Sequence, residues 1–356
     1  MIDRENYFDN AATTPIDERV LAAMLPYLKE DFGNANSLHE LGRRAGDAVE
    51  RAREHVAALI GAEDPQQITF TSGSTEANQW VLAFPNCAVS PFEHSSIYEV
   101  VRHRGIGAFL KHNGLGITPA NEAYDLVSVM AVNNEIGSLF HPSAAKGKAR
   151  RVHSDLTQAA GKIPFQLDGL DYASLSAHKI HGPKGIGALY SRELPPPPMM
   201  IGEQERGFRG GTLNVAGIVG FGEAARIANL EEAQNLEHVT NLRQQLVESL
   251  QDVPDMKLNG GECVSPYILS LSFLGVEGES LVIDLDRQSY AISSGAACSS
   301  KSLEPSHVLL ALNTEPGWIR STIRISLSRY NSSSSVRLLS QNLKRSVEIL
   351  RTMGRA

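Results

Sequence analysis

The sequence contains few cysteines, no run of charges of one sign and no long apolar segment. Its 356 residues include three widely spaced cysteines, Cys87, Cys263 and Cys298. This odd number fits neither a disulfide framework nor a zinc ribbon, so we expect a reducing compartment and no metal site. Forty acidic and 33 basic residues give a net charge of −7, which argues against nucleic-acid binding. No apolar stretch approaches the roughly 18 residues of a bilayer span and no leader peptide is evident, so we expect a cytoplasmic protein without membrane contact.

The order of predicted elements indicates an α/β domain in the first part of the chain. Apolar residues recur at helical spacing from Ala45 to Ile60, and Gly61 follows as a C-cap. A further helix is expected at 76–82. Strands are predicted at 68–71, 126–132, 151–154, 172–176 and 186–190. Because helical stretches separate these strands, we expect a mostly parallel sheet.

The order of elements predicts a second, α+β domain in the last third of the chain. A helical zone runs from 215 to 250, and Pro254 marks a boundary. Beyond it we expect strands at 268–273, 290–293 and 319–327, and helices at 280–287, 305–312 and from the serine run 332–335 onward. The last helix carries Val336, Leu339 and Leu343 on one face, and a serine of the run can cap it.

A glycine turn at residues 71–76 is the first candidate for chemistry. It lies between a predicted strand and a predicted helix, where backbone N–H groups converge in front of the helix dipole. Such a turn can hold a phosphate group. The alternative is an ordinary turn in which Glu76 serves as a helix cap.

Two strand ends carry the next candidates. Asp155 follows the strand at 151–154, at the sheet edge where ligands gather in α/β proteins; a helix N-cap is its alternative role. Lys179 ends a strand between two histidines and is better placed than Lys184 to act as a nucleophilic amine. The alternative for Lys179 is a solvated loop lysine.

Cys298 lies among small residues, in the segment 293–301. This composition is typical of an exposed loop, so a reactive thiol is as plausible as an inert one. Cys87 and Cys263 lack such surroundings and are expected to be structural. A phosphate cradle, a strand-end acid and a lysine together fit pyridoxal phosphate, which needs a phosphate site, a partner for its pyridinium nitrogen and a Schiff-base lysine.

At this point the chain resembles a known family, the cysteine desulfurases of the Nif/Isc type. These are pyridoxal-phosphate enzymes of aminotransferase class V with the fold-type I architecture. The motifs that carry the resemblance lie in one order along the chain, at residues 7–15, 32–37, 71–78, 132–137, 153–162, 176–185, 204–212, 293–306 and 323–327. The resemblance implies a large, mostly parallel-sheet domain (15–252) and a smaller α+β domain (1–14 and 253–356) with a mobile cysteine loop.

The resemblance also implies how a cofactor is held. Lys179 would form the Schiff base with pyridoxal phosphate, Asp155 would pair with the pyridine nitrogen, and Gln158 would contact the ring hydroxyl. His94 would stack on the ring and take part in proton transfer. The residues expected at the phosphate group are Ser74, Thr75, Ser176, His178 and, from the other subunit of a homodimer, Thr212.

The implied activity is the conversion of L-cysteine to L-alanine, with sulfur passing to Cys298 as a persulfide. Asn134 and Arg324 would bind the substrate, Arg324 through its carboxylate. An iron–sulfur scaffold or a sulfur carrier would then receive the sulfur. Alternatives are a selenocysteine lyase or a cysteine sulfinate desulfinase, both less dependent on Cys298, and a non-catalytic sulfur-transfer scaffold.

Overall fold

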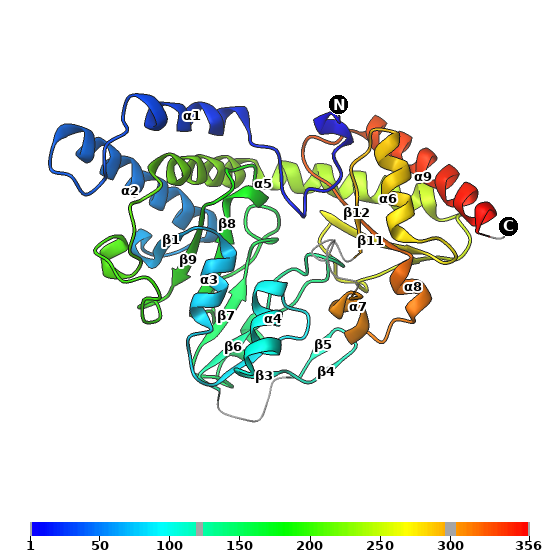
Figure 1. Cartoon of the computed structure of the whole chain (residues 1–356), viewed down its shortest axis with the longest axis horizontal. Helices are drawn as coiled ribbons and strands as arrows, with labels where there is room; N and C mark the ends of the chain where they lie inside the picture. Colours follow the sequence, from blue (N-terminus) through cyan, green and yellow to red (C-terminus); the bar gives the residue numbers. More distant parts are fainter. Residues whose placement is uncertain (1, 119–123, 296–303, 355–356) are drawn as a thin grey trace.

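The computed structural model describes residues 2–118, 124–295 and 304–354, and its larger sheet has seven strands (Figure 1). These strands are β1 (Ile68–Thr71), β2 (Cys87–Val89), β3 (Ala108–Phe109), β6 (Leu126–Ser128), β7 (Val152–Asp155), β8 (Tyr172–Ser176) and β9 (Gly187–Ser191). Their order is β1-β9-β8-β7-β6-β2-β3. Neighbours from β8 to β3 run parallel, whereas β9 is antiparallel to both β1 and β8. The predicted, mostly parallel sheet is therefore confirmed.

Helices cover both faces of this sheet. They are α2 (Glu40–Ile60), α3 (Ser74–Val81), α4 (Ser95–Arg104) and α5 (Val215–Leu250), and α1 (Glu18–Lys29) packs on α5. Side chains alternate along a strand, so Tyr172 and Leu189 pack with α3 and α4, whereas Ala173 and Tyr190 pack with α2 and α5. The amphipathic pattern predicted from Ala45 onward is the buried face of α2, and Gly61 caps it at φ 70°.

The second sheet is antiparallel and lies toward the other end of the molecule (Figure 1). It contains β10 (Met256–Leu258), β11 (Ile268–Phe273), β13 (Thr322–Ser326) and β12 (Ser293–Ser294), in that order. Helices α6 (Gly278–Arg287) and α9 (Ser333–Met353) pack together beside it, and α9 also packs against α5. Ser332 caps α9 by accepting a hydrogen bond from the Ser335 N–H (3.1 Å), as the serine run predicts.

Three expected strands differ in extent from the observed ones. The strand expected at 319–327 begins only at Thr322, because Pro316–Arg320 forms helix α8, whose first turn tolerates the missing N–H of proline. The strand expected at 290–293 is displaced to β12, while Ala291 pairs with Tyr7. The strand at 126–132 ends at Ser128 as β6. The helix expected at 305–312 is confirmed as α7 (His307–Ala311). The elements that were not predicted are α1, α4, the strands β2, β3 and β10, and the pair β4 (His112–Asn113) and β5 (Gly116–Ile117).

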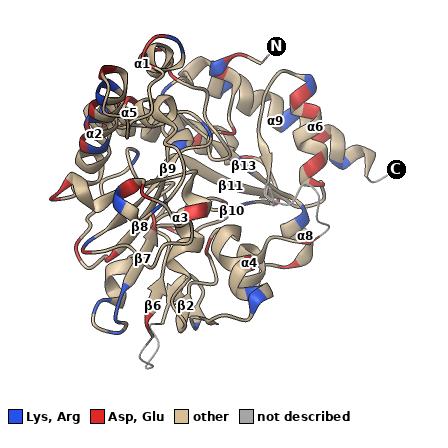
Figure 2. Ribbon diagram, turned by 60° about the vertical axis from the view of Figure 1, so that its left-hand side comes forward, with Lys and Arg blue, Asp and Glu red and all other residues tan. Residues whose placement is uncertain are grey.

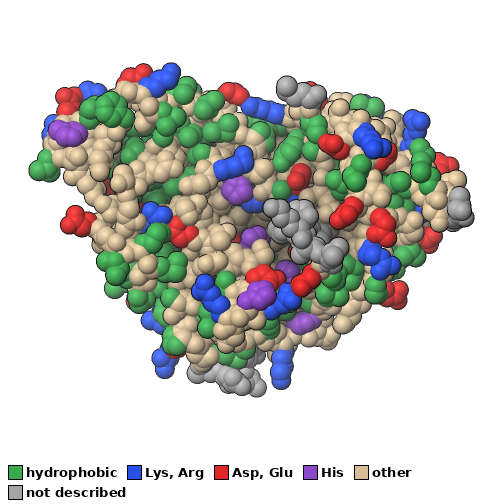
Figure 3. All heavy atoms as spheres, in the orientation of Figure 1, with side chains coloured by type: hydrophobic (Ala, Val, Ile, Leu, Met, Phe, Trp, Pro, Cys, Tyr) green, Lys and Arg blue, Asp and Glu red, His purple; other side chains and the backbone are tan. Residues whose placement is uncertain are grey.

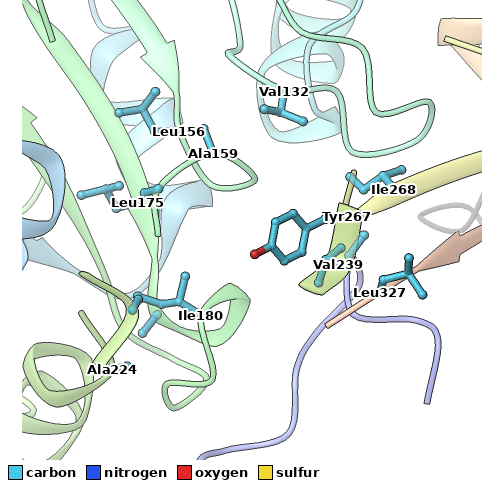
Figure 4. Close-up of a cluster of buried hydrophobic side chains, with 14 of the residues drawn as sticks. Val132, Leu156, Ala159, Leu175, Ile180, Ala224, Val239, Tyr267, Ile268 and Leu327 are labelled. Carbon is cyan, nitrogen blue, oxygen red and sulfur yellow. The ribbon is translucent and has the colours of Figure 1, made fainter. Parts of the chain in front are cut away.

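One continuous apolar core joins the two sheets (Figure 4). Leu175 of β8 and Ile268 of β11 belong to the same buried cluster, with Val239 of α5 and Tyr267 between them. The core therefore shows no break at the predicted domain boundary near residue 253, and the division into two domains stays a prediction. In the described part of the chain, no helix combines the length and apolar character of a transmembrane span.

Candidate active site

A pocket of about 260 Å³ opens where the two sheets meet. Arg324 reaches it from β13, and the other polar lining residues come from the larger sheet and its loops. Nine predicted site residues line it: Ser74, Thr75, His94, Asn134, Asp155, Gln158, His178, Lys179 and Arg324. Figure 3 shows the surface hollowed near its centre, with histidine side chains along the hollow.

The glycine turn 71–76 forms one end of the pocket. β1 ends at Thr71, Gly73 is the N-cap of α3, and Ser74 and Thr75 form the first turn. The N–H groups of a first turn have no carbonyl partner within the helix, so they suit an anion.

Glu76 also has the capping role considered as the alternative. Its Oε2 accepts a hydrogen bond from the Ser72 N–H (2.7 Å), and Arg209 donates to both carboxylate oxygens (2.9 and 3.1 Å). Burial alone would raise the pKa of Glu76, but these hydrogen bonds hold it below its ordinary value. Since Arg209 neutralises the carboxylate, the cap and an anion site can coexist beside the helix.

Asp155, buried at the end of β7, begins a polar network. Its Oδ1 accepts from the Thr157 N–H (2.9 Å), and its Oδ2 accepts from Asn78 Nδ2 (2.8 Å). The helix N-cap considered as the alternative is not observed, because a turn follows β7 and no helix begins there. Asn78 Nδ2 also donates to Ser96 Oγ (2.9 Å), which lies 2.8 Å from His94 Nδ1. Asn78 and Ser96 thus fix Asp155 relative to His94, and the sequence analysis missed both.

The two histidines of the pocket are held neutral. Burial, opposed by Asp155 and assisted by Lys179, lowers the pKa of His94. Burial and the positive charge of Lys179 lower the pKa of His178 to about 3. At pH 7 both rings can therefore donate one hydrogen bond and accept another.

Lys179 ends the short 3₁₀ turn Ala177–Lys179 after β8 and points to the N-terminal segment of the chain. Its Nζ donates to the carbonyl oxygens of Ala11 (2.6 Å) and Ala12 (2.7 Å). Gln158 Nε2 donates to the same Ala11 oxygen (2.9 Å). Lys184, in contrast, is an exposed loop lysine. The wall formed by Ala11 and Ala12 was missed as part of the site, although it lies in the motif 7–15.

Arg324 is fully buried at the opposite wall. One Nη donates to the Asn134 carbonyl (2.9 Å) and the other to Asp9 Oδ1 (2.8 Å), whereas the buried Nε has no hydrogen-bond partner among the described residues. Asn134 therefore positions Arg324 through its backbone. Asp9, which the sequence analysis missed, supplies the counter-charge of the guanidinium.

The remaining predicted site residues are not in the pocket lining. Ser176 is buried at the end of β8, and Thr212 is exposed. Cys298 lies outside the described residues. Of the two cysteines expected to be structural, Cys87 is buried, and burial raises its pKa to about 11, but Cys263 is exposed. No group of three or more His, Cys, Asp or Glu side chains within residues 2–118, 124–295 and 304–354 could hold a metal ion.

A two-sheet α/β fold with a strand-end carboxylate, a lysine and a helix N-terminus in one pocket defines a fold-type I enzyme. The family model for "Aminotransferase class-V" matches residues 6–100 and 117–339. The chain belongs to this family.

Relatives over nearly the full length agree with that assignment. The chain is 38% identical over 382 residues to "Cysteine desulfurase IscS" of Dictyoglomus turgidum, covering 99% of this chain and 96% of the relative. It is 39% identical to the protein of the same name from Escherichia coli, covering 98% and 94%. Among solved structures, a "NIFS-LIKE PROTEIN" superposes with a TM-score of 0.87 at 35% identity, covering 98% of this chain and all of that one. "SspA in complex with cysteine" has a TM-score of 0.77 at 29% identity, covering 92% and 100%.

Proposed function

We propose that this protein is a pyridoxal-phosphate-dependent cysteine desulfurase, which converts L-cysteine to L-alanine and transfers the sulfur to Cys298. The observation that carries the proposal is the pocket in which Lys179, Asp155 and Arg324 converge. The relatives named cysteine desulfurase support it over nearly the full chain.

The donor set of the pocket fits pyridoxal phosphate. Ser74 and Thr75, in the first turn of α3, would hold the phosphate together with His178 and the nearby Ser176. Asp155 would keep a proton on the ring nitrogen, Gln158 would face the ring hydroxyl, and His94 would lie against the ring. When bound, this cofactor stabilises negative charge at the substrate Cα.

Arg324 would then bind the substrate, and Lys179 would act as the base. Arg324, which lines the pocket, would bind the substrate carboxylate through its guanidinium. Asn134 holds the guanidinium in place through its carbonyl. The Lys179 amine, which the Ala11 and Ala12 carbonyls orient, would take the Cα proton as a general base and return it when alanine forms.

Sulfur transfer would use Cys298 as a thiolate nucleophile. The thiolate attacks the substrate sulfur and forms a sulfur–sulfur bond. The electron pair of the breaking carbon–sulfur bond remains on the substrate carbon, which is protonated to give alanine. A persulfide is left on Cys298 for an acceptor such as an iron–sulfur scaffold or a sulfur carrier.

Replacing Cys298 by alanine is expected to abolish sulfide release and lower alanine formation at least about 100-fold, while the visible absorption of the bound cofactor stays unchanged. The assay supplies L-cysteine and a thiol reductant and measures both products. Cys263→Ala is the matched control, because Cys263 is an exposed cysteine away from the pocket. Full activity of Cys298→Ala with selenocysteine or cysteine sulfinate would instead favour the lyase or desulfinase. A wild-type protein that binds no cofactor would favour the non-catalytic scaffold.

The phosphate end of the pocket depends on close contact between two glycines. A Cβ at Gly187 would lie 2.6 Å from Gly73 Cα and 2.4 Å from the Leu175 carbonyl oxygen, both backbone atoms. Gly187→Ala is therefore expected to displace the turn and raise the Kd for pyridoxal phosphate at least about tenfold, which corresponds to about 1.4 kcal/mol. A titration of the apoprotein measures it. Gly317→Ala, whose Cβ meets only a flexible leucine side chain, should leave this Kd unchanged; an equal Kd in both variants would contradict the prediction.

We also propose that the enzyme is a homodimer in which Thr212 reaches the partner's phosphate site. Large apolar side chains are exposed in and after α1 and near residue 200, among them Leu38 (90%) and Ile201 (91%). Several apolar side chains lie on the surface around α1 at the upper left of Figure 3. An exposed apolar region of this kind is typical of a protein interface. In the view of Figure 2, acidic and basic residues are interspersed along the ribbon.

A further inference from the structure

Lys162 is a buried lysine that the proposed reaction does not use. It follows Gly161 in the turn after β7 and is 7% exposed. Its Nζ lies 5.9 Å from the ring centroid of Tyr267, which projects into the core between the two sheets (Figure 4). Among the described residues no carboxylate forms an ion pair with it. A buried amine without a counter-charge lowers the stability of the folded protein. The presence of Lys162 beside the pocket therefore needs an explanation.

The amine contacts one side of the Gln158 amide. Lys162 Nζ donates to Gln158 Oε1 at 2.8 Å. An ammonium group only donates, and a glutamine amide accepts only at its oxygen. The bond therefore selects one of the two amide orientations and turns Nε2 toward the Ala11 carbonyl (2.9 Å).

The Ala11 carbonyl links this amide to the Lys179 amine. Its oxygen accepts from Gln158 Nε2 and from Lys179 Nζ (2.6 Å). Lys162 and Lys179 also line the same cavity of about 30 Å³, together with Tyr267. If the Gln158 amide turned by 180°, its oxygen would face the carbonyl oxygen of Ala11, which is repulsive. The orientation of the amide thus affects the position of both Ala11 and Lys179.

We propose that Lys162 is a positioning residue, which holds the Gln158 amide in the orientation that the cofactor ring requires and, through the Ala11 carbonyl, places the Lys179 amine. The inference rests on the proposed function for the roles of Gln158 and Lys179.

The charge of Lys162 is sensitive to pH. Burial, and then the nearby charges of Lys179 and Arg324, lower the pKa of Lys162 to about 7. The other titratable and charged side chains around the cavity beside Lys162 are His181, Tyr267 and Arg329. Burial lowers the pKa of His181 to about 3 and raises that of Tyr267 above its ordinary range, so neither changes charge near pH 7.

Lys162→Met tests the proposal, because methionine fills a similar volume without a donor. We expect kcat to fall about 10- to 100-fold with little change in KM, since a misplaced amine slows proton transfer more than binding. We also expect the absorption band of the bound cofactor to shift. In the wild type, protonation of the Lys162 amine should change this band near pH 7, and that pH dependence should be absent from the variant. Lys162→Arg should restore part of the activity. Lys257→Met, at an exposed lysine of β10, is the matched control.

A second comparison separates positioning from folding. In a Gln158→Ala background, Lys162→Met should cost less than about twofold in kcat, because its partner is already absent. The same loss in both backgrounds, or an unchanged kcat and spectrum in Lys162→Met, would overturn the proposal. The spectrum requires cofactor binding but not turnover, so a wild type that binds the cofactor without releasing alanine would refute the proposed reaction and still allow this test. A wild type that binds no pyridoxal phosphate would overturn both.

Stability gives a control for folding. The pKa of Lys162 in the folded chain lies below its ordinary value of 10.5, so between about pH 7 and 10.5 the unfolded chain binds the additional proton and wild-type stability rises with pH. The urea midpoint of the Lys162→Met apoprotein should therefore exceed that of the wild type most below pH 7, and the difference should shrink toward pH 10. A variant that is more stable and yet slower cannot owe its low kcat to unfolding.

Discussion

Lys179→Ala is expected to abolish the formation of alanine and sulfide from L-cysteine, with a loss of at least about 10⁴ in kcat. The amine ends the turn after β8 and is aimed into the pocket by the Ala11 and Ala12 carbonyls, at 2.6 and 2.7 Å. Alanine can neither bind the cofactor covalently nor accept the Cα proton. The phosphate end of the pocket stays intact, so the variant should still bind pyridoxal phosphate reversibly. Product assays and the loss of colour on gel filtration measure the two effects.

Two control variants separate the amine from its charge. Lys179→Arg keeps a positive charge but has no usable base at neutral pH, so its activity should be as low as that of Lys179→Ala. Lys184→Ala removes the neighbouring exposed lysine and should retain most of the activity. If Lys179→Ala kept more than about one hundredth of the wild-type rate, Lys179 could not be the base and covalent partner of the cofactor.

Residues at strand ends were predictable because a parallel sheet brings them to one edge. Asp155 is the last residue of β7 and Lys179 lies in the turn after β8. The apolar pattern locates the ends of both strands within one residue, and β7 and β8 are neighbours in the sheet. The turn before Ser74 follows from the same order of strand, glycine and helix. The roles of these side chains stay predictions, but the pocket contains all three.

Contacts between distant segments could not be predicted from local patterns. Arg324 pairs with Asp9, which lies 315 residues earlier, and Asn78 reaches Asp155 across 77 residues. Hydrophobic periodicity reports which face of an element is buried and carries no information about the polar partner opposite it. The predicted start of β13 was wrong for a related reason. Ile319 is apolar enough for a strand, but it belongs to the short helix that begins at Pro316.

A buried ion pair behind the phosphate turn is another such contact, and it joins three segments. Arg53 of α2 donates to both oxygens of Glu205, at 2.8 and 2.9 Å, and both side chains are almost completely buried. Glu205 Oε2 also accepts from the Phe70 N–H of β1 (2.7 Å), and Arg53 donates to the Ile68 carbonyl (2.7 Å). The segment of Glu205 continues to Arg209, which neutralises Glu76 beside the turn.

Glu205→Ala should therefore lower the free energy of unfolding by about 3 kcal/mol, because it leaves the buried Arg53 guanidinium with only the half-exposed Glu50 carboxylate (3.2 Å) as an ion-pair partner. Urea unfolding of the apoprotein measures the loss. Removing both charges in Arg53→Met with Glu205→Leu should cost much less, and Glu40→Ala, in the exposed pair with Arg44, should cost below about 1 kcal/mol. A Glu205→Ala variant as stable as Glu40→Ala would contradict the prediction and mean that Glu50 or water compensates the Arg53 charge. Because Arg209 lies four residues beyond Glu205, the same variant should also weaken cofactor binding, whereas Glu40→Ala should not.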